Sequence, residues 1–350
     1  NYSQAIEAYT QEAGKSPLEP EQRLNLAASY FKTRQFGKAA DLYVELFRKD
    51  SLMNNHHFNS MLQALSKTSE RERVSAFLNT RKDALADELL ENAEFNAVLL
   101  EGQAPSASFE VFALNTNSTQ ADFSPSFFGD DQLLFSSSRP QEEKDVYGPS
   151  GEAYLDIYSS TLEASGQARN PRPIEWLPEL KFHEATPYYS AELDGVFYVR
   201  SNAERNRLTF DENGKNSLVV GLARRNGDFS LLLRDPSTSF YYPFYDAAND
   251  RLYFAADFEE GYGGTDIYYV ATNEGRIMSA PVNLGPRINS PGNEIAPYIL
   301  DGSLYFASDV FYGLGGMDVY KSTIRPGGQY SIPVNLGPGI NTRHDEFGFI

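Results

Sequence analysis

The chain has 350 residues, of which 41% are apolar, 13% aromatic and 22% charged. This composition excludes a chain that is disordered throughout, and the length favours two or more domains. The net charge of −18 argues against nucleic acids and anionic lipids as partners, because an acidic surface repels phosphate groups. The absence of cysteine excludes disulfides, thiolate zinc sites and cysteine nucleophiles.

The composition changes near residue 104. Before this point the chain is rich in Ala, Leu, Glu and Lys, and after it Tyr, Phe, Gly, Pro, Asn and Ser dominate. The segment between the two parts, 101–108, consists mainly of small residues and proline, which is typical of a linker. We therefore predict a helical domain at 1–104 and a second domain at 105–350.

The first part repeats with a period of 34 residues. Tyr2, Ala5 and Tyr9 are followed, 34 positions later, by Phe36, Ala39 and Tyr43. Small residues at Ala27 and Ala39 would allow two helices to cross closely, and this unit resembles a tetratricopeptide (TPR) repeat. The pattern is weaker at 55–83, and 84–101 is predicted to be a final amphipathic helix that covers the open end of the stack. A generic bundle of α-hairpins is the alternative.

The second part repeats with a period near 52 residues. Asn283-Leu284-Gly285 recurs at 335–337, Leu252-Tyr253-Phe254 at 304–306, and the Gly-Gly-x-Asp run of 263–266 at 315–318. Within each copy, short aromatic and aliphatic runs are separated by turn residues, which indicates antiparallel strands. Four such strands in each unit, repeated radially, predict the blades of a β-propeller, and the innermost strands would carry a repeated proline, at Pro125, Pro187, Pro243 and Pro297.

The chain ends indicate how the ring would close. Glu346 lies 52 residues after Glu294 and so begins a new inner strand, while Phe109–Phe112 matches a third strand. The sequence therefore predicts a multidomain protein, α then β, in which a TPR-like α-solenoid precedes a five-bladed β-propeller. Its last blade would be split between the residues near 109 and the C-terminal end. We also expect the natural polypeptide to continue beyond Ile350, because the rest of that blade is missing.

Two repeated carboxylate positions were considered as chemical sites. Asp266 and Asp318 follow Gly-rich turns, and a side chain that recurs in each blade more often stabilises a turn than binds a cation. Glu184, Glu294 and Glu346 share another repeat position, where each would accept backbone donors between blades. The four histidines, without any cysteine, also argue against a dedicated zinc site.

The sequence contains no recognisable catalytic motif. It has no G-x-S-x-G elbow, and its carboxylate pairs, such as 130–131 and 142–143, fall in predicted turns or in the insertion 141–154. The single tryptophan, Trp176, does not fit the signature of Asp-box glycosidases. We therefore assign no catalytic, cofactor-binding or metal-ligating residue and no cofactor, and we predict that the protein is not an enzyme.

The order of TPR-type helices followed by blades that read NLGPxIN, E-x-x-P-Y, LYFAS and GGxDVY resembles a known family. It is similar to the TPR plus WD40-like (PD40) β-propeller part of OmpA-family outer-membrane-associated proteins of Bacteroidetes, including PorE-type members of the type IX secretion and gliding machinery. The resemblance implies a periplasmic lipoprotein at the inner face of the outer membrane. It also implies a peptidoglycan-binding domain outside this sequence.

Two repeat domains without a catalytic set favour a non-enzymatic scaffold. We expect it to link an outer-membrane β-barrel or secretion-ring protein to the cell wall through protein–protein contacts, with no nucleic acid or small-molecule substrate. One alternative is a propeller hydrolase that acts on glycans or peptides, aided by the insertion 141–154. Another is a carbohydrate- or metal-binding module that uses the Gly-Gly-x-Asp turns.

Overall fold

The structure of the protein is a computed structural model, which describes residues 2–49, 57, 60–61, 64–65, 87–102, 112–141, 145–178 and 180–350. Three predictions concern residues outside these ranges. They are most of the weak repeat at 55–83, the domain boundary at 104/105, and positions 109–111 of the split strand.

The N-terminal part is helical, as predicted. Its described helices are α1 (Tyr2–Ala13), α2 (Pro20–Lys32), α3 (Phe36–Lys49) and α6 (Asp87–Gly102). Helix α2 begins with a proline in its first turn, and the Glu19 backbone N–H donates to Gln22 Oε1 at 2.9 Å. No described helix is long and apolar enough to span a membrane.

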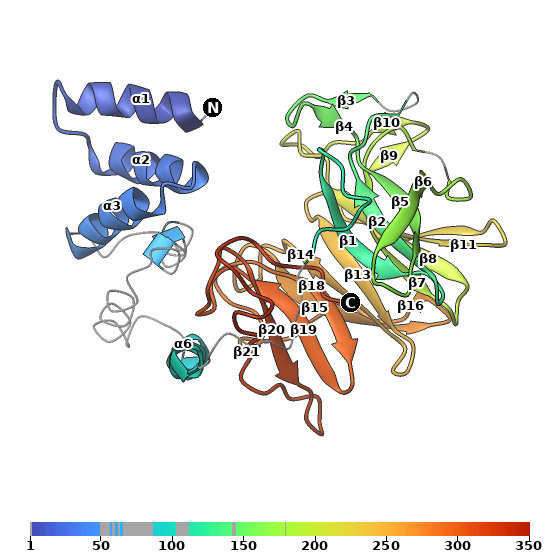
Figure 1. Ribbon diagram of the computed structural model, residues 1–350. Helices are drawn as coiled ribbons and strands as arrows, with labels where there is room; N and C mark the ends of the chain where they lie inside the picture. The colour runs from blue at the N-terminus through green and yellow to red at the C-terminus, as the bar shows by residue number, and fades with distance from the viewer. Residues whose placement is uncertain are drawn as a thin grey trace.

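Helices α2 and α3 pack through the small residues that the repeat pattern singled out. Ala27 and Ala39 are fully buried in one core, together with Tyr43 and Phe47. The predicted TPR-like α-solenoid is nevertheless wrong for the described part of the chain, which contains four short helices. Helices α1, α2 and α3 lie in one stack, whereas α6 runs along the strands of blade IV (Figure 1) and shares Ala93 and Leu100 with the core of the helices.

Four antiparallel sheets form the β-propeller, which confirms the predicted fold of the second part. Blade I contains β1 (Asp122–Phe127), β2 (Gln132–Ser137), β5 (Asp156–Leu162) and β6 (Ala168–Pro173). Blade II contains β7 (Glu184–Ser190), β8 (Gly195–Ser201), β11 (Leu218–Arg224) and β12 (Phe229–Leu233). Blade III contains β13 (Phe240–Asp246), β14 (Arg251–Ala256), β15 (Asp266–Asn273), β16 (Arg276–Ile277) and β17 (Val282–Asn283). Blade IV contains β18 (Glu294–Leu300), β19 (Ser303–Ser308), β20 (Asp318–Thr323) and β21 (Val334–Asn335).

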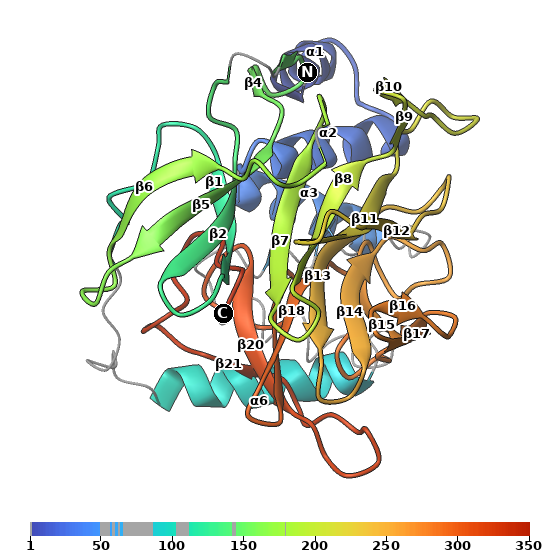
Figure 2. The same ribbon diagram turned by 90° about the vertical axis from the view of Figure 1, so that its right-hand side faces the viewer.

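Two small hairpins extend from blades I and II. One pairs β3 (Val146–Tyr147) with β4 (Glu152–Ala153), within the predicted insertion 141–154, and the other pairs β9 (Ala203–Glu204) with β10 (Arg207–Leu208). Both project from the same end of the propeller as helix α1 in Figure 2.

The repeated proline lies on the innermost strand of each blade, as predicted. In every blade the pairing of this strand with the next shifts at a bulge, and the residue before the proline has positive φ. The bulge accommodates a proline that cannot donate to the sheet, and it turns the inner strand at the axis. These positive-φ residues are Ser124, Thr186, Tyr242 and Ala296, with φ between 49° and 54°.

The predicted count of five blades is wrong, because four sheets form complete blades. The C-terminal segment 346–350 takes only the innermost place of a fifth. Glu346 N–H donates to Met317 O at 2.7 Å, just as Glu294 N–H donates to Thr265 O at 2.7 Å one repeat earlier. Gly348 repeats the positive φ, at 78°, and the Phe349 ring stacks on Tyr305 at 4.2 Å.

Of the strand 109–112 predicted to complete that blade, only Phe112 lies in the described residues, and it is not part of a strand. Phe112, its last residue, lies against Gly166 in the turn between β5 and β6, and the Asn115 backbone N–H donates to Gln167 Oε1 at 2.9 Å. This part of the chain therefore follows the outer hairpin of blade I. The residue types of this segment match a third strand. A third strand forms, however, only where a second strand is available to pair with it.

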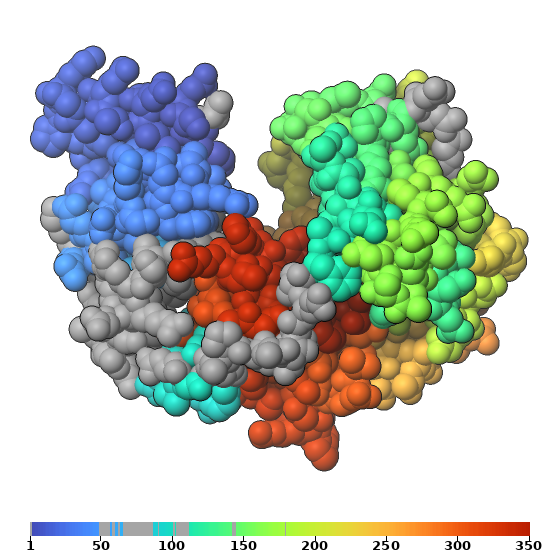
Figure 3. Space-filling view, in the orientation of Figure 1, coloured from blue at the N-terminus to red at the C-terminus, as the bar shows by residue number. Residues whose placement is uncertain are grey.

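The helices are joined to blade IV by a shared core and by polar contacts. Tyr312 and Leu314, from the loop between β19 and β20, pack into the core of the helices. Asn92 and Asn96 of α6 both donate to Pro333 O, at 3.0 and 2.9 Å. The two parts are thus held side by side, with the surface hollowed between the α1–α3 stack and blade I (Figure 3).

Replacing Gly37 with alanine is expected to stabilise the protein by about 0.5–1 kcal/mol. Gly37 is exposed within α3, and an added Cβ would have no heavy atom within 4 Å, so the gain is helix propensity alone. Gly151→Ala is the matched control, since its Cβ also has open space but its φ of +75° makes alanine strained. Urea unfolding should give opposite signs for the two variants, and equal signs would contradict the argument.

Candidate functional site

The Asp of each Gly-Gly-x-Asp turn has a structural role, as predicted. Asp318 is buried and accepts hydrogen bonds from Gly315 N–H at 2.9 Å and from Asn335 Nδ2 at 2.7 Å. Asp266 accepts from Tyr262 N–H at 2.6 Å and from Asn283 Nδ2 at 2.8 Å. Each carboxylate thus ties a turn to the outer strand of its blade, and burial raises the pKa of both.

The second asparagine of each NLGPxIN motif completes this link. Asn289 accepts from Ile267 N–H at 2.8 Å and donates to Ile267 O at 3.0 Å, and Asn341 makes the same pair of bonds to Val319, at 2.8 and 2.9 Å. The period of 52 residues therefore arises because the same buried polar network recurs in blades III and IV. Within the described ranges, no three His, Asp or Glu side chains gather in a way that could hold a metal ion.

The repeated glutamate differs in one respect from its predicted role. Glu294 accepts from Ser290 N–H at 2.7 Å and from the hydroxyls of Ser290 and Ser308, both at 2.6 Å. These donors belong to the strand β19 of its own blade and to the loop that enters the blade, whereas the bond between blades is made by the backbone of Glu294. Burial outweighs these bonds and raises the pKa of Glu294 to about 8.

The propeller axis offers little room for a ligand. The cavity there has a volume of about 30 Å³ and is lined by the inner strands of all four blades and by residues 348–350. The bulged strands bring proline and aromatic side chains to the axis, among them Pro187, Pro243 and Phe349. A space of this size holds about one water molecule, so a glycan would need another site.

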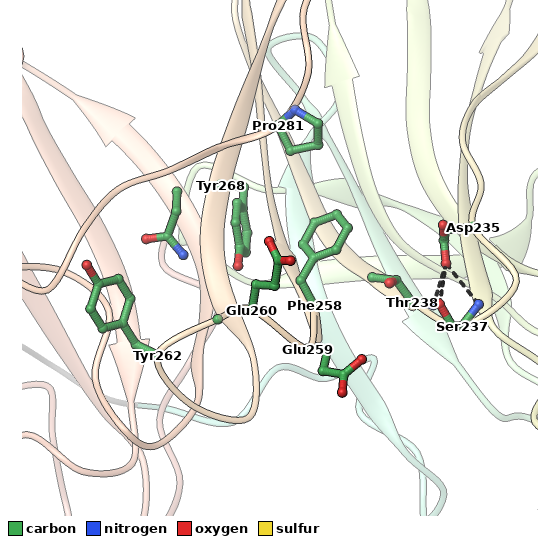
Figure 4. A pocket seen from close by; sticks show the side chains of 11 residues that line it. Asp235, Ser237, Thr238, Phe258, Glu259, Glu260, Tyr262, Tyr268 and Pro281 are labelled. Carbon is green, nitrogen blue, oxygen red and sulfur yellow. Dashed lines mark hydrogen bonds between the residues drawn. The ribbon is translucent and has the colours of Figure 1, made fainter.

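A larger pocket, of about 690 Å³, lies at the border of blades II and III. One wall is the β12–β13 loop with Asp235 and Thr238, and another is the β14–β15 loop (258–262). Its lining residues are Asp235, Ser237, Thr238, Phe258, Glu259, Glu260, Gly261, Tyr262, Tyr268, Pro281 and Asn283 (Figure 4). The volume suits a small organic ligand or one to two sugar units.

Asp235 is held in place at one edge of this pocket. Its Oδ1 accepts from the backbone N–H groups of Ser237 and Thr238, at 2.8 and 2.9 Å, and from the Ser237 hydroxyl at 2.7 Å. Burial raises the pKa of this carboxyl, but the hydrogen bonds together outweigh burial, so the pKa lies below its usual value. All three bonds go to Oδ1. Because its pKa lies below the usual value, Asp235 supplies an ionised carboxylate at neutral pH.

Aromatic rings and two further carboxylates line the rest of the pocket. Phe258 and Tyr268 meet edge to face, with ring centroids 4.9 Å apart, and Tyr262 is half exposed. In the view of Figure 4 the Glu260 carboxylate points toward Tyr268 and Phe258, and Glu259 points to the other side. The site thus combines charged oxygen atoms with flat apolar surfaces.

Sequence reasoning missed this pocket, although one signal was present. Glu259 and Glu260 lie 52 residues before Phe311 and Tyr312, so blade III carries two acids where blade IV carries two aromatic residues. The pocket also needs the β12–β13 loop of the neighbouring blade, which the repeat pattern does not place. The β3–β4 hairpin, where the insertion suggested a site, contributes none of the lining residues.

Comparisons with known proteins found low-identity matches among solved structures alone. No family model and no curated protein matches the sequence. Among solved structures, a family 117 glycoside hydrolase from the marine bacterium Zobellia galactanivorans is similar over 66% of this chain and 75% of its own, with 13% identity and a TM-score of 0.39. An α-L-arabinofuranosidase from Clostridium thermocellum matches over 63% and 74%, with 12% identity and a TM-score of 0.38. The AtxE2 isopeptidase matches over 64% and 35%, with 13% identity and a TM-score of 0.28.

These findings contradict two predictions from the sequence. Several of the matched structures are named as glycoside hydrolases or arabinofuranosidases, so the expected non-enzymatic scaffold and the statement that the protein is not an enzyme are both withdrawn. At identities of 9–15% and TM-scores of 0.36–0.39, these matches transfer no active-site residue to this chain. Any function has to be argued from the pocket itself.

Proposed function

We propose that the propeller is a glycan hydrolase whose substrate binds in the pocket between blades II and III. One observation carries the proposal: carboxylates from two different loops and three aromatic rings line a single cavity of about 690 Å³. The repeat itself does not require Glu259 and Glu260, because aromatic side chains occupy their equivalent places in blade IV.

The lining of the pocket matches the surfaces of a sugar. A sugar ring has apolar C–H faces, which can pack on Phe258, Tyr262 and Tyr268, and hydroxyl groups at its edge, which can donate to carboxylates. Aromatic rings with a few polar groups at fixed positions are the usual composition of a small-molecule site. Tyr268 and Thr238 are buried, so part of the lining is preformed by the sheet.

Hydrolysis of a glycosidic bond needs two carboxyl groups with different tasks. One protonates the leaving oxygen, and the other acts as the base that activates water or as the nucleophile that attacks the sugar. Asp235, whose pKa is lowered by three hydrogen bonds, fits the ionised role. Glu260, whose side chain points toward two aromatic residues in Figure 4, is the candidate for the proton donor.

The test is turnover and binding on a panel of oligosaccharides. We expect measurable hydrolysis of at least one glycan class, and Asp235→Asn and Glu260→Gln should each lower the rate about 10²- to 10⁴-fold while the fold is retained. The control is Asp130→Asn, an exposed carboxylate in the β1–β2 turn outside the pocket, which should leave the rate unchanged. Binding without turnover would reject the catalytic role, and neither binding nor turnover on the panel would reject the whole proposal.

Several predictions from the resemblance remain proposals beside this one. They are membership of the OmpA-associated family, a periplasmic location at the outer membrane, and partners among outer-membrane or secretion-ring proteins. Glycan hydrolysis is compatible with a place near the cell wall. Fractionation of native cells would test the location, and recovery of the protein in the cytosol would reject it.

A further inference from the structure

The blade repeat identifies which pocket residues the fold does not need. Phe311 and Tyr312 of blade IV are buried, and Tyr312 and the nearby Leu314 pack into the core of the helices. The equivalent residues of blade III are Glu259, Glu260 and Tyr262, which are exposed. The helices therefore cover this place in blade IV and leave it open in blade III, where the side chains are free to serve a ligand.

The charge of the open site has one sign. Three of the eleven lining residues are acidic, and none is Lys, Arg or His. The Lys215 ammonium group lies nearby, but it binds Asp257 Oδ2 at 2.8 Å and Ser237 O at 2.9 Å, so a neighbouring acid already balances its charge. With a net charge of −18 for the chain, an anionic sugar would be repelled from this pocket.

The buried carboxyl group of Asp266 adds to the negative charge of the pocket. Asp266 is almost fully buried, and its Oδ2 accepts hydrogen bonds from two lining residues, Tyr262 and Asn283. Its Oδ1 meets no hydrogen-bond donor within the described ranges. The pocket thus has acidic side chains in its lining and a buried carboxyl bonded to two of its lining residues, together with aromatic faces that attract cations.

We propose that the pocket selects a glycan that carries a protonated amine, such as an oligosaccharide of glucosamine. This inference rests on the proposed function and names its substrate class. The ammonium groups along the oligosaccharide donate charge-assisted hydrogen bonds, for which Asp235 and Glu259 supply acceptors. The sugar ring packs on Tyr262 and on the pair formed by Phe258 and Tyr268. A neutral N-acetyl sugar packs on the same rings, but it lacks the ammonium charge that the carboxylates attract.

Calorimetry with three oligosaccharides of equal length tests this selectivity at about pH 6. They are an oligomer of glucosamine, its N-acetylated form and an oligomer of galacturonate, and a lysine oligomer serves as a peptide probe. We expect the amine form to bind at least tenfold more tightly than the N-acetyl form, and the galacturonate not to bind. The preference should shrink when salt is raised from about 0.05 to 0.5 M, because the pairs are partly exposed to solvent.

Variants separate selectivity from the proposed function. The variant Glu259→Gln, which lies outside the proposed catalytic pair, should lose most of the amine preference and keep its affinity for the N-acetyl form within about twofold, whereas Asp130→Asn should behave like the parent protein. Equal binding of the amine and N-acetyl forms would overturn this inference and leave glycan hydrolysis standing. Binding of the lysine oligomer as tight as that of the amine sugar would overturn it in favour of a peptide ligand. Failure of every saccharide to bind would overturn both proposals.

Discussion

Replacing Glu294 with glutamine is expected to flatten the dependence of folding stability on pH between about 4.5 and 8. Glu294 is fully buried, and its pKa rises from 4.5 to about 8 in the folded protein. The folded state therefore binds a proton in this range that the unfolded chain has already released. The contribution of Glu294 to stability is then greatest below pH 4.5, falls as the pH rises through this window, and levels off above the folded pKa.

The size of this effect makes it measurable. A pKa shift of this extent corresponds to a loss of folding stability on the order of 5 kcal/mol between the two ends of the pH window, as an upper bound. The Glu294→Gln variant retains a neutral group that can bind the hydroxyls of Ser290 and Ser308, so it should be more stable than the parent at pH 8 and similar at pH 5. Urea unfolding at both pH values gives the comparison.

The control for this experiment lies one repeat later. Glu346 has the same place relative to Thr342, but it is only partly buried, so Glu346→Gln should change the pH dependence much less. If both variants flattened the curve equally, burial would not be the cause. If Glu294→Gln were less stable than the parent at pH 8, the carboxyl would be ionised in the folded state and the argument would be wrong.

Replacing Gly263 with alanine is expected to destabilise the protein by about 3 kcal/mol. A Cβ at this position would lie within 2.5 Å of the Pro291 carbonyl carbon and still closer to the carbonyl oxygens of Ser290 and Gly292. These are backbone atoms of the loop that enters blade IV, and the neighbouring Gly264 N–H donates to Gly292 O at 2.6 Å. The contact between blades III and IV would have to open, at the upper end of the cost of overpacking a core.

Two further glycines test the origin of this loss. Gly315 is the equivalent residue one repeat later and would clash with carbonyl oxygens of Thr342 and His344, so Gly315→Ala should detach the C-terminal segment from blade IV. Gly148→Ala, in the β3–β4 hairpin, has no atom within 4 Å of its Cβ and should be neutral. Thermal melting and proteolysis of the C-terminal segment separate these cases, and a neutral Gly263→Ala would contradict the close approach of the two blades.

The repeat with a period of 52 residues was readable because the same physical task recurs in successive blades. Each Asp of the Gly-Gly-x-Asp turn binds the Asn of the outer strand, so Asp266 with Asn283 predicts Asp318 with Asn335. The proline of each inner strand recurs for a similar reason, since every blade bends at a bulge beside the axis. Short antiparallel strands and their order in the blade followed from such local patterns.

The closure of the ring and the packing of the helices could not be predicted from local sequence patterns in this way. Phe112 matched a third strand in residue type, but it lies against Gly166 of blade I. Segment 84–101 matched an end-covering helix, but Leu89 of α6 packs into blade IV while Ala93 and Leu100 pack with the helices. In both cases the choice depended on which surface was available to bury the segment.

The sequence by itself determined the order of the two parts, the strands of each blade and the buried Asp–Asn network, because hydrophobic period, turn residues and repeated polar partners are local properties. Only the tertiary structure decided the blade count, the position of α6 and the acidic pocket. Asp235 and Glu260 come from loops of different blades, and they line one cavity because the blades pack edge to edge. The same packing lets the helices cover the equivalent loop of blade IV and leave that of blade III open, since one stack of helices can bury only one of the two surfaces.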